Sequence, residues 1–554
     1  MDESTKHNIR LAHNFDDKSA TDYLVKYQNI LELVDAQTSA HSEDEYLVFY
    51  DDKGNRTVYS YTEFRHKVNK LANFLLQNDI QLEDRIATFS HNHSDTVILY
   101  YACWSIGAVI VPLNVNEEPD MVKYILDNSS TRMVFTRNEY VSKLAEIGGS
   151  FKVVSFDEAD FSGLPGEIDS SYENHSNKES EAMIVYTSGT TGNPKGVVLT
   201  QYNLMADAFA ISEWHQLYSG DTMMCVLPIH HVNGTVVTIM TTMFYGGRLV
   251  LNQKFHTDKF FKRLADEGVK VVSVVPTLLQ FLLHSEEYSS KHDLNKFSHI
   301  ICGAGPLTCE IARNFEQRFG LRIVHGYGLS ETTCYSCFIP MDLPDEEHSR
   351  WQNDFGFPAI GIPINCNDMA IHDENGNHLE EEQKGEIVIR GHNVMKYYFD
   401  NDEVNRKTFE FGWFRSGDEG FFKYDNNGKP YFFITGRLKE LIIRGGVNIS
   451  PLEIDEVLSG LDFVKAGIAV GFDNDWYGEE VGALVILNTA PADDAEAESY
   501  RQMVISGCAA KLPFHKAPKV VILSDTIPVT STGKYQRNKV KHLFTEHKAT
   551  QFKK

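Results

Sequence analysis

Cysteine is scarce in this chain of 554 residues, which contains eight of them. So few thiols over such a length do not form the disulfide framework of a small secreted domain. Cys334 and Cys337 have the spacing of half a zinc site, but a structural zinc needs four ligands, and neither a second CxxC nor a paired histidine lies nearby. We therefore expect ordinary thiols rather than a zinc site.

Long apolar runs and an excess of positive charge are also missing. No stretch approaches the roughly 18 consecutive apolar residues of a membrane span, and Met1 to Ser4 show no sign of a signal peptide. Lys and Arg number 52 against 77 Asp and Glu, a formal net charge of −25, which argues against a nucleic-acid or anionic-membrane surface. We expect a soluble, cytoplasmic protein with no nucleic-acid partner and no membrane span.

Helices alternating with short buried strands run through most of the chain. Phe64, Val68, Leu71 and Leu75 recur at helical spacing, and the strand-like run 86–89 follows after a polar turn. The same alternation continues to about residue 301. It predicts an α/β fold whose large N-terminal domain consists of layered helices and largely parallel sheets.

A turn signal at 425–428 and a charged segment at 436–440 predict a domain boundary. We expect an N-terminal domain over 1–435 and a charged connecting segment over 436–440. A small, mobile α+β domain then follows over 441–554.

The most informative segment handles phosphate. It reads Tyr186-Thr187-Ser188-Gly189-Thr190-Thr191-Gly192-Asn193-Pro194-Lys195-Gly196. Glycines allow close backbone approach, hydroxyls and successive N–H groups surround phosphate oxygens, and Lys195 adds a charge. A P-loop requires Ser or Thr directly after its lysine and then a helix, whereas Gly196 and an apolar strand follow here. A flexible linker is disfavoured because apolar runs flank the segment on both sides.

Four further polar clusters follow in a fixed order. They are Gly326-Tyr327-Gly328-Leu329-Ser330-Glu331-Thr332, Arg415-Ser416-Gly417-Asp418, the stretch from Arg437 to Glu453, and Thr530-Ser531-Thr532-Gly533-Lys534. Together with the phosphate segment they resemble the adenylate-forming superfamily, which contains acyl-CoA synthetases, adenylation domains of peptide synthetases and luciferases. The resemblance extends from about residue 62 to about residue 539.

This resemblance implies an AMP-forming acid–thiol ligase that uses ATP and Mg²⁺. A carboxylate attacks the α-phosphorus of ATP to give acyl-AMP and pyrophosphate, and the acyl group then passes to coenzyme A. One alternative acceptor is the phosphopantetheine of an acyl carrier protein, and Arg444 suits either CoA phosphates or an acidic carrier surface. A non-catalytic nucleotide-binding regulator is the alternative outside enzymes, because fold does not fix function.

The resemblance also assigns the nucleotide site. The β- and γ-phosphates are held by Thr187, Ser188, Gly189, Thr190, Thr191, Gly192 and Lys195. Adenine stacks on Tyr327, the α-phosphate contacts Ser330, Mg²⁺ binds Glu331, and both ribose hydroxyls donate to Asp418. Arg437 reaches the nucleotide or forms an interdomain salt bridge. Lys534 is the second catalytic lysine beside Lys195, because its compact charge offsets the repulsion between carboxylate and α-phosphate.

The acyl pocket and the moving parts follow from the same resemblance. Pocket residues are His230, His231, Gly303, Gly305, Gly326, Cys334 and Tyr335. His230 replaces a usual Phe or Tyr, and the Asp that pairs with an α-ammonium group is absent, which argues against a standard α-amino acid. A hydrogen-bonded structural role is the alternative for either histidine. Lys439 matches the hinge, while Gly445 and Gly446 line a thiol tunnel or form only a turn.

Overall fold

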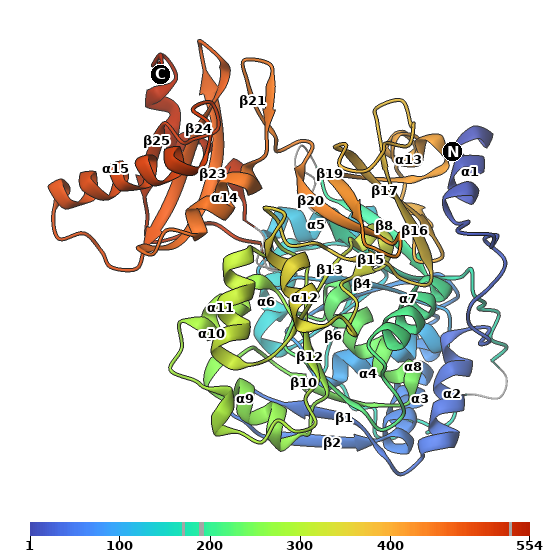
Figure 1. Ribbon diagram of the computed structural model, residues 1–554. Coiled ribbons are helices and arrows are strands. Elements are labelled where there is room, and N and C mark those ends of the chain that lie inside the picture. Colours follow the sequence, from blue (N-terminus) through green and yellow to red (C-terminus); the bar gives the residue numbers. More distant parts are fainter. Residues whose placement is uncertain (169–171, 188–192, 531–534, 554) are drawn as a thin grey trace.

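The computed structural model describes residues 1–168, 172–187, 193–530 and 535–553. Figure 1 shows a large N-terminal domain of sheets and helices with a smaller C-terminal domain, orange to red, at one side. Both domains mix helices with sheets, and the sheets of the large domain are mostly parallel, so the predicted α/β class is confirmed.

The first sheet has nine strands among the described residues. In spatial order they are β15 (Ile362–Pro363), β14 (Cys337–Phe338), β13 (Ile323–Tyr327), β12 (His299–Cys302), β11 (Val271–Val274), β9 (Thr222–Cys225), β10 (Arg248–Asn252), β1 (Glu45–Tyr50) and β2 (Arg56–Ser60). The pairs from β13 to β1 are parallel, and the pairs at either edge are antiparallel. Parallel strands need crossover helices on the sheet faces, which accounts for the alternation in the sequence.

The second sheet has seven strands within the described ranges. Their order is β18 (Tyr397–Tyr398), β8 (Lys195–Thr200), β7 (Glu181–Thr187), β4 (Val109–Leu113), β3 (Arg85–Phe89), β5 (Met133–Thr136) and β6 (Lys152–Ser155). The β7–β8 hairpin is antiparallel and pairs Thr187 with Lys195, so the ends of the phosphate segment lie side by side. The predicted strand at 86–89 falls within β3.

Helices of the N-terminal domain cover and separate these sheets. They are α1 (Glu3–Ala12), α2 (Ile30–His41), α3 (Tyr61–Gln77), α4 (Ser94–Ser105), α5 (Pro119–Asn128), α6 (Asn138–Ile147), α7 (Gln201–Trp214), α8 (Thr241–Tyr245), α9 (Thr257–Asp266), α10 (Pro276–Leu283), α11 (Cys309–Phe319), α12 (Asp345–Asn353) and α13 (Asp402–Thr408). All four apolar positions predicted on α3 are buried. Helix α4 is buried at every residue except Asp95, as expected for a helix packed on nearly all sides.

A third sheet leads to the C-terminal domain. It is antiparallel and contains β16 (Asn367–His372), β17 (Gly385–Gly391), β19 (Phe414–Tyr424) and β20 (Pro430–Arg437). Strand β20 ends at Arg437, two residues past the expected end of the N-terminal domain. The boundaries at 435 and 440, and the mobility of the smaller domain, stay predictions.

The C-terminal domain has its own hydrophobic core, which includes Ile442, Ile454 and Val485. Its strands are β21 (Ile442–Arg444), β22 (Val447–Ile449), β23 (Val464–Asn474), β24 (Gly478–Leu487) and β25 (Val520–Leu523), and its helices are α14 (Pro451–Ser459) and α15 (Asp494–Lys511). Pro451 opens α14 as predicted, with Ser450 as its cap. None of the helices in the described ranges is long and apolar enough to cross a membrane.

All eight cysteines lie within the described residues, and all are buried thiols with no disulfide among them. Burial raises the pKa of the Cys225 thiol to about 11 and that of the Cys508 thiol to about 12. Thiols in such surroundings stay protonated at neutral pH.

A buried ion pair fixes the end of the chain to the C-terminal domain. Arg537 Nη1 donates to Asp455 Oδ1 at 3.1 Å and to the Ala469 carbonyl at 2.9 Å. The Asp455 carboxylate also accepts from Ala469 N at 2.6 Å. Both side chains are 7% exposed, so loss of one partner leaves the other as an unpaired buried charge.

We therefore expect Arg537→Met to destabilise the C-terminal domain by roughly 3–5 kcal/mol. Hydrogen exchange of β23 during denaturant titration measures this loss. Lys539→Met is the matched control, because Lys539 is exposed two residues away, and it should change the free energy of unfolding little. Equal, small effects of the two substitutions would show that the ion pair does not hold this domain together.

Candidate active site

The predicted pocket residues gather at one edge of the nine-stranded sheet. Strands β9, β11, β12 and β13 are parallel neighbours, so their carboxyl ends open on the same side. The segment with His230 follows β9, Gly303 and Gly305 follow β12, and Gly326 lies within β13. Ligands of open α/β sheets bind at this edge, which places the acyl pocket where the sheet geometry allows one.

Tyr335 lies against Gly303, another residue predicted to line the acyl pocket. A side chain at Gly303 would meet the Tyr335 hydroxyl at 2.5 Å and the Gly326 carbonyl at 2.7 Å. Asn233 Nδ2 donates to that hydroxyl at 3.3 Å, and Ser273 Oγ donates to Asn233 Oδ1 at 2.7 Å. This side of the pocket is therefore polar, with glycine required at 303.

Three further residues predicted to line the pocket are Gly326, Gly305 and Cys334, and each has different neighbours. A side chain at Gly326 would run into the Phe338 ring, so only glycine fits there. At Gly305 a side chain would lie 3.4 Å from Pro276, an ordinary contact, so the room predicted at this position exists. Cys334 is buried next to Tyr335.

The two histidines stand at the start of an unusual helix. Their ring centroids are 4.5 Å apart, and a π-helix over Asn233–Met240 follows them, a form frequent at functional sites. His230 Nε2 is buried and has no hydrogen-bond partner among the described residues. Burial, and then the nearby His231 and His91, hold the pKa of His230 well below its usual value, so its imidazole is neutral.

Asp418 is the most deeply buried charge of the nucleotide half, with its side chain 1% exposed. Tyr327 donates its hydroxyl to Asp418 Oδ2 at 2.6 Å, and Arg437 Nε lies 3.1 Å from Asp418 Oδ1. Oδ1 accepts no hydrogen bond with good geometry from the described residues. The attraction of Asp418 raises the pKa of Arg437, while burial and then Asp418 raise that of Tyr327. This arrangement leaves Asp418 able to accept from a ligand hydroxyl.

Arg437 has a defined place in this cluster. Asp418 and Arg437 are directly paired residues of the adjacent strands β19 and β20. Their ion pair therefore lies within the third sheet. This contact is therefore not an interdomain salt bridge, which was one of the two roles expected for Arg437.

A second cluster joins Glu331, Lys195 and Tyr398. Tyr398 donates its hydroxyl to Glu331 Oε1 at 2.7 Å, and Lys195 Nζ lies 5.0 Å from the centre of the Tyr398 ring. Burial and the positive charge of Lys439 lower the pKa of Lys195, while Glu331 opposes this shift. The predicted hinge residue therefore lies within electrostatic range of the predicted phosphate lysine. Ser330 and Glu331 begin a 3₁₀ turn directly after β13.

Several predicted residues lie outside the described part of the chain. They are Ser188, Gly189, Thr190, Thr191, Gly192 and the catalytic Lys534. Thr187 and Lys195 mark the two ends of the phosphate segment on β7 and β8. Tyr535, directly after Lys534, bridges to Val529 and faces Gln280 of α10 in the N-terminal domain.

The tunnel glycines stand apart from both clusters. Gly445 and Gly446 have φ of 57° and 84° and form the turn of the β21–β22 hairpin, which projects from the C-terminal domain in Figure 1. The structure thus contains the turn that was expected as the alternative role of these two glycines. Arg444 is 9% exposed, donates from Nε to Glu480 Oε1 at 2.7 Å and lies 3.9 Å from the centre of the Tyr477 ring. Its Nη2 has no hydrogen-bond partner in the described chain, and the role expected for Arg444 at CoA phosphates or an acidic carrier surface stays a prediction.

Sequence reasoning missed Tyr398, Asn233 and Glu456. Tyr398 lies in a two-residue strand that pairs with β8, and no local pattern marks it. Asn233 lies two residues after His231, so the nearby histidines were a usable signal. Glu456 was assigned only to the first turn of a helix. In the structure it crosses to the other domain, where its carboxylate accepts from Cys309 N at 2.9 and 3.2 Å.

Comparison with known proteins agrees with this geometry. The family model described as AMP-binding enzyme matches residues 34–399. The chain is 32% identical over 465 residues to sulfoacetate–CoA ligase of Cupriavidus necator, covering 82% of this chain and 86% of that protein. It is 31% identical over 483 residues to oxalate–CoA ligase of Arabidopsis thaliana, covering 84% and 89%.

Among solved structures, ATP-bound MatB from Rhodopseudomonas palustris superposes with a TM-score of 0.80 at 25% identity, over 94% of this chain and 99% of that chain. An o-succinylbenzoate coenzyme A synthetase from Bacillus subtilis, with ATP and magnesium bound, shares the fold with a TM-score of 0.78 at 23% identity, over 92% and 99%. The chain belongs to the AMP-binding enzyme family of the adenylate-forming superfamily, as an AMP-forming acid–thiol ligase.

The contact of Glu456 with the N-terminal domain makes the domain interface sensitive to pH. Burial raises the pKa of Glu456 from 4.5 to about 7, and nearby Glu310 adds to the shift while Cys309 and Arg313 oppose it. A raised pKa means that docking favours the protonated carboxyl. This contribution is complete below pH 4.5 and is lost as the pH rises through about 7.

We expect the two domains to separate more often at about pH 8 than at about pH 6, and Glu456→Gln to remove this dependence. Spin labels at Ser290→Cys and Lys465→Cys, both exposed and in different domains, report the distance between them; the native cysteines are buried. Glu498→Gln on exposed α15 is the control and should keep the wild-type response. The same pH response in Glu456→Gln would rule out Glu456 as the titrating group.

Proposed function

We propose that the enzyme activates a carboxylic acid as acyl-AMP and transfers the acyl group to coenzyme A. The arrangement around Asp418 and Glu331 supports this proposal most directly. One buried carboxylate keeps an oxygen for a ribose hydroxyl, and a second carboxylate lies beside a lysine at the end of the phosphate segment. Nucleotidyl transfer requires both features, because sugar and phosphates must be fixed together.

The residues present fit a magnesium ion bound together with ATP. No group of three His, Cys, Asp or Glu side chains within the described ranges forms a ready-made metal site. Magnesium in nucleotide enzymes is commonly held by one or two carboxylates plus substrate phosphates, and Glu331 supplies one such carboxylate. Bound there, the ion neutralises phosphate charge. Tyr398 orients the carboxylate through its hydrogen bond.

The lysines of this site each oppose negative charge at a different place. Lys195, at the start of β8, is positioned to hold the pyrophosphate that leaves. Lys534 would bridge the attacking carboxylate and the α-phosphate, two anions that otherwise repel each other. Lys439 lies near Lys195, and its turn is held by a hydrogen bond from Leu438 N to the Gly417 carbonyl, next to Asp418. Movement at the proposed hinge would therefore change the charge around the phosphate site.

The acid is proposed to be short and to carry a second polar group. His230 Nε2 is a buried hydrogen-bonding atom without a partner in the described chain, and the wall at Tyr335 presents a polar network of Asn233 and Ser273. An unpaired buried polar atom costs free energy unless a ligand satisfies it. Two relatives are named for sulfoacetate and oxalate, both short acids with two anionic groups.

Coenzyme A is the acceptor that the relatives' names support. Arg444 does not distinguish coenzyme A from a carrier protein, because a guanidinium suits either acceptor, and its Nε is paired with Glu480. Gly445 and Gly446 remain proposed as the backbone beside which a pantetheine arm passes. Thioester formation with free coenzyme A, compared with that on a carrier protein whose phosphopantetheine thiol is free, decides between the two acceptors.

ATP–pyrophosphate exchange over a panel of short, aryl, fatty and amino acids tests the first half-reaction. Lys534→Ala should lower exchange by roughly 10²–10³-fold, the scale for removing one charge-stabilising donor, and spare thioester formation from supplied acyl-AMP. Lys539→Ala should leave both steps unchanged. Equal loss of both steps in Lys534→Ala would refute its assigned role, and no exchange with any acid would refute the activity.

Tyr398→Phe should raise the magnesium concentration needed for half-maximal exchange by roughly 10-fold, because the Glu331 carboxylate loses the hydrogen bond that orients it. The phenyl ring under Lys195 is retained. Tyr397→Phe is the matched control, since the Tyr397 hydroxyl contacts Glu181 on the other side of the strand. An unchanged magnesium requirement in Tyr398→Phe would show that Glu331 does not bind the metal.

A further inference from the structure

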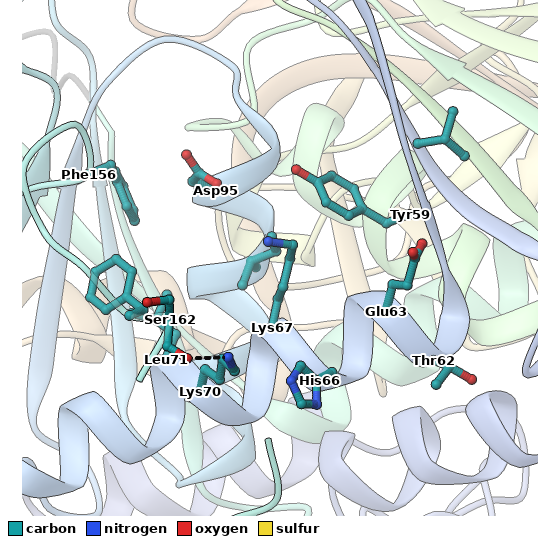
Figure 2. Close-up of a pocket in the computed structure, with 13 residues that line it drawn as sticks. Tyr59, Thr62, Glu63, His66, Lys67, Lys70, Leu71, Asp95, Phe156 and Ser162 are labelled. Atoms are coloured by element: carbon teal, nitrogen blue, oxygen red, sulfur yellow. Dashed lines mark hydrogen bonds between the residues drawn. The ribbon is translucent and has the colours of Figure 1, made fainter. Parts of the chain in front are cut away.

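A cavity of about 580 Å³ opens on the N-terminal domain and contains none of the residues of the candidate active site. Figure 2 shows it above α3, bounded by β2, the start of α4 and the segment after β6. Its lining is Val58, Tyr59, Thr62, Glu63, His66, Lys67, Lys70, Leu71, Asp95, Ile98, Phe156, Phe161 and Ser162. The volume is within the range of small-molecule sites, about 300–1,000 Å³.

The walls are apolar and the mouth is polar. Leu71 and Ile98 are buried, Phe156 lies at one side in Figure 2, and Phe161 also lines the cavity. The exposed side chains of α3 stand at the rim. Apolar walls with a few fixed polar groups are typical of a small-molecule site.

Most charged groups of the cavity already have partners. Asp95 forms ion pairs with Arg137 and with His93, the latter at 3.3 Å. The Glu63 carboxylate accepts from Ser60 N at 2.9 Å and so caps α3. Lys70 Nζ donates to the Ser162 carbonyl at 2.6 Å, the dashed line in Figure 2. These groups hold the cavity's shape and are not available to a ligand.

Lys67 is different. Its ammonium group lies 5.4 Å from the centre of the Tyr59 ring, and no carboxylate in the described chain is within 4.0 Å of it. In Figure 2 it reaches into the middle of the cavity. Glu63 and Asp95 equal Lys67 and Lys70 in number, but both carboxylates already have partners and Lys70 donates to a carbonyl. Lys67 is therefore the charged group of the lining that has no hydrogen bond or ion pair among the described residues. The complementary ligand is an anion.

We propose that this cavity binds a small organic anion, a carboxylate or sulfonate on an apolar body. The anionic group pairs with Lys67, and the apolar body lies against Leu71, Phe156 and Phe161. A cationic group would be repelled by the Lys67 ammonium, and a fully apolar molecule would form no ion pair with it. The site is separate from the acid-activating site and does not depend on the proposed reaction.

The cavity is connected to the acyl pocket through a short rigid segment. Asn92 lies three residues before Asp95; it accepts from Ile229 N at 2.9 Å and donates to the Leu227 carbonyl at 2.9 Å. Ile229 directly precedes His230. A ligand held at the start of α4 would therefore lie a few residues from this contact, and any coupling between the two sites would pass through it.

The probe for this site is 1-anilinonaphthalene-8-sulfonate, an anion on an apolar body whose fluorescence rises on burial. We expect saturable binding that is weakened at least 10-fold by Lys67→Glu and kept by Lys67→Arg. Lys53→Glu, an exposed lysine outside the lining, is the charge-matched control and should bind as the wild type. ATP should not displace the probe. Bound probe should also slow hydrogen exchange of the 226–231 segment.

Unchanged affinity in Lys67→Glu, or displacement of the probe by ATP, would overturn the site, because binding would then lie elsewhere. Lys67 is exposed, so its variants should fold, and circular dichroism confirms this before the titration. Slower exchange at 226–231 in the wild type but not in Lys67→Glu would support the connection to the acyl pocket. Equal exchange in both would overturn that connection.

Discussion

The direction of parallel strands is the constraint on which the acyl half of this enzyme depends. Because β9, β11, β12 and β13 run the same way, the segments that follow them meet at one edge of the sheet. The strands supply a rigid, buried frame, and the loops after them carry the histidine pair and the glycines. The candidate functional side chains thus lie in loops, where the backbone N–H and C=O groups are not used for hydrogen bonds between strands.

The nucleotide half depends instead on one buried carboxylate. A charge removed from water is costly unless it is paired and hydrogen-bonded, and Asp418 is served by Tyr327 from the first sheet and by Arg437 from the third. The carboxylate therefore joins two sheets as well as facing the nucleotide site. The turn that follows Arg437 leads to the second domain, so this carboxylate lies where any reorientation of that domain begins.

Much of this arrangement follows from the sequence. The helix at 61–77, the strand at 85–89 and the α/β class follow from apolar spacing. The motif with Ser330 and Glu331 follows the end of β13, where such polar residues are expected, whereas Arg415 to Asp418 lie within β19. Contacts between distant segments do not follow. Tyr398 meets Glu331 only because β18 pairs with β8, and Glu456 meets Cys309 only because two domains dock. Arg444 shows the same limit, because its charge alone did not indicate the pairing with Glu480.

Pocket shape is still less accessible to sequence reasoning. The space at Gly305 could be anticipated, because a missing side chain leaves room. The position of the Tyr335 hydroxyl over Gly303 could not be anticipated, because it depends on how the loop after the 3₁₀ turn crosses the end of β12. The unpaired state of His230 Nε2 is likewise a property of the packed structure, because any of several neighbours could have satisfied it.

The burial of all eight cysteines has a chemical consequence for an enzyme of this class. Acyl adenylates are mixed anhydrides that acylate thiolates, and a reactive thiolate requires exposure and a low pKa. Cys337, close to the nucleotide half, is buried, and burial raises its pKa far above neutral pH. A protein that prepares an acyl group for a thiol thus presents no thiol of its own at its surface, and its intermediate is kept for the incoming acceptor.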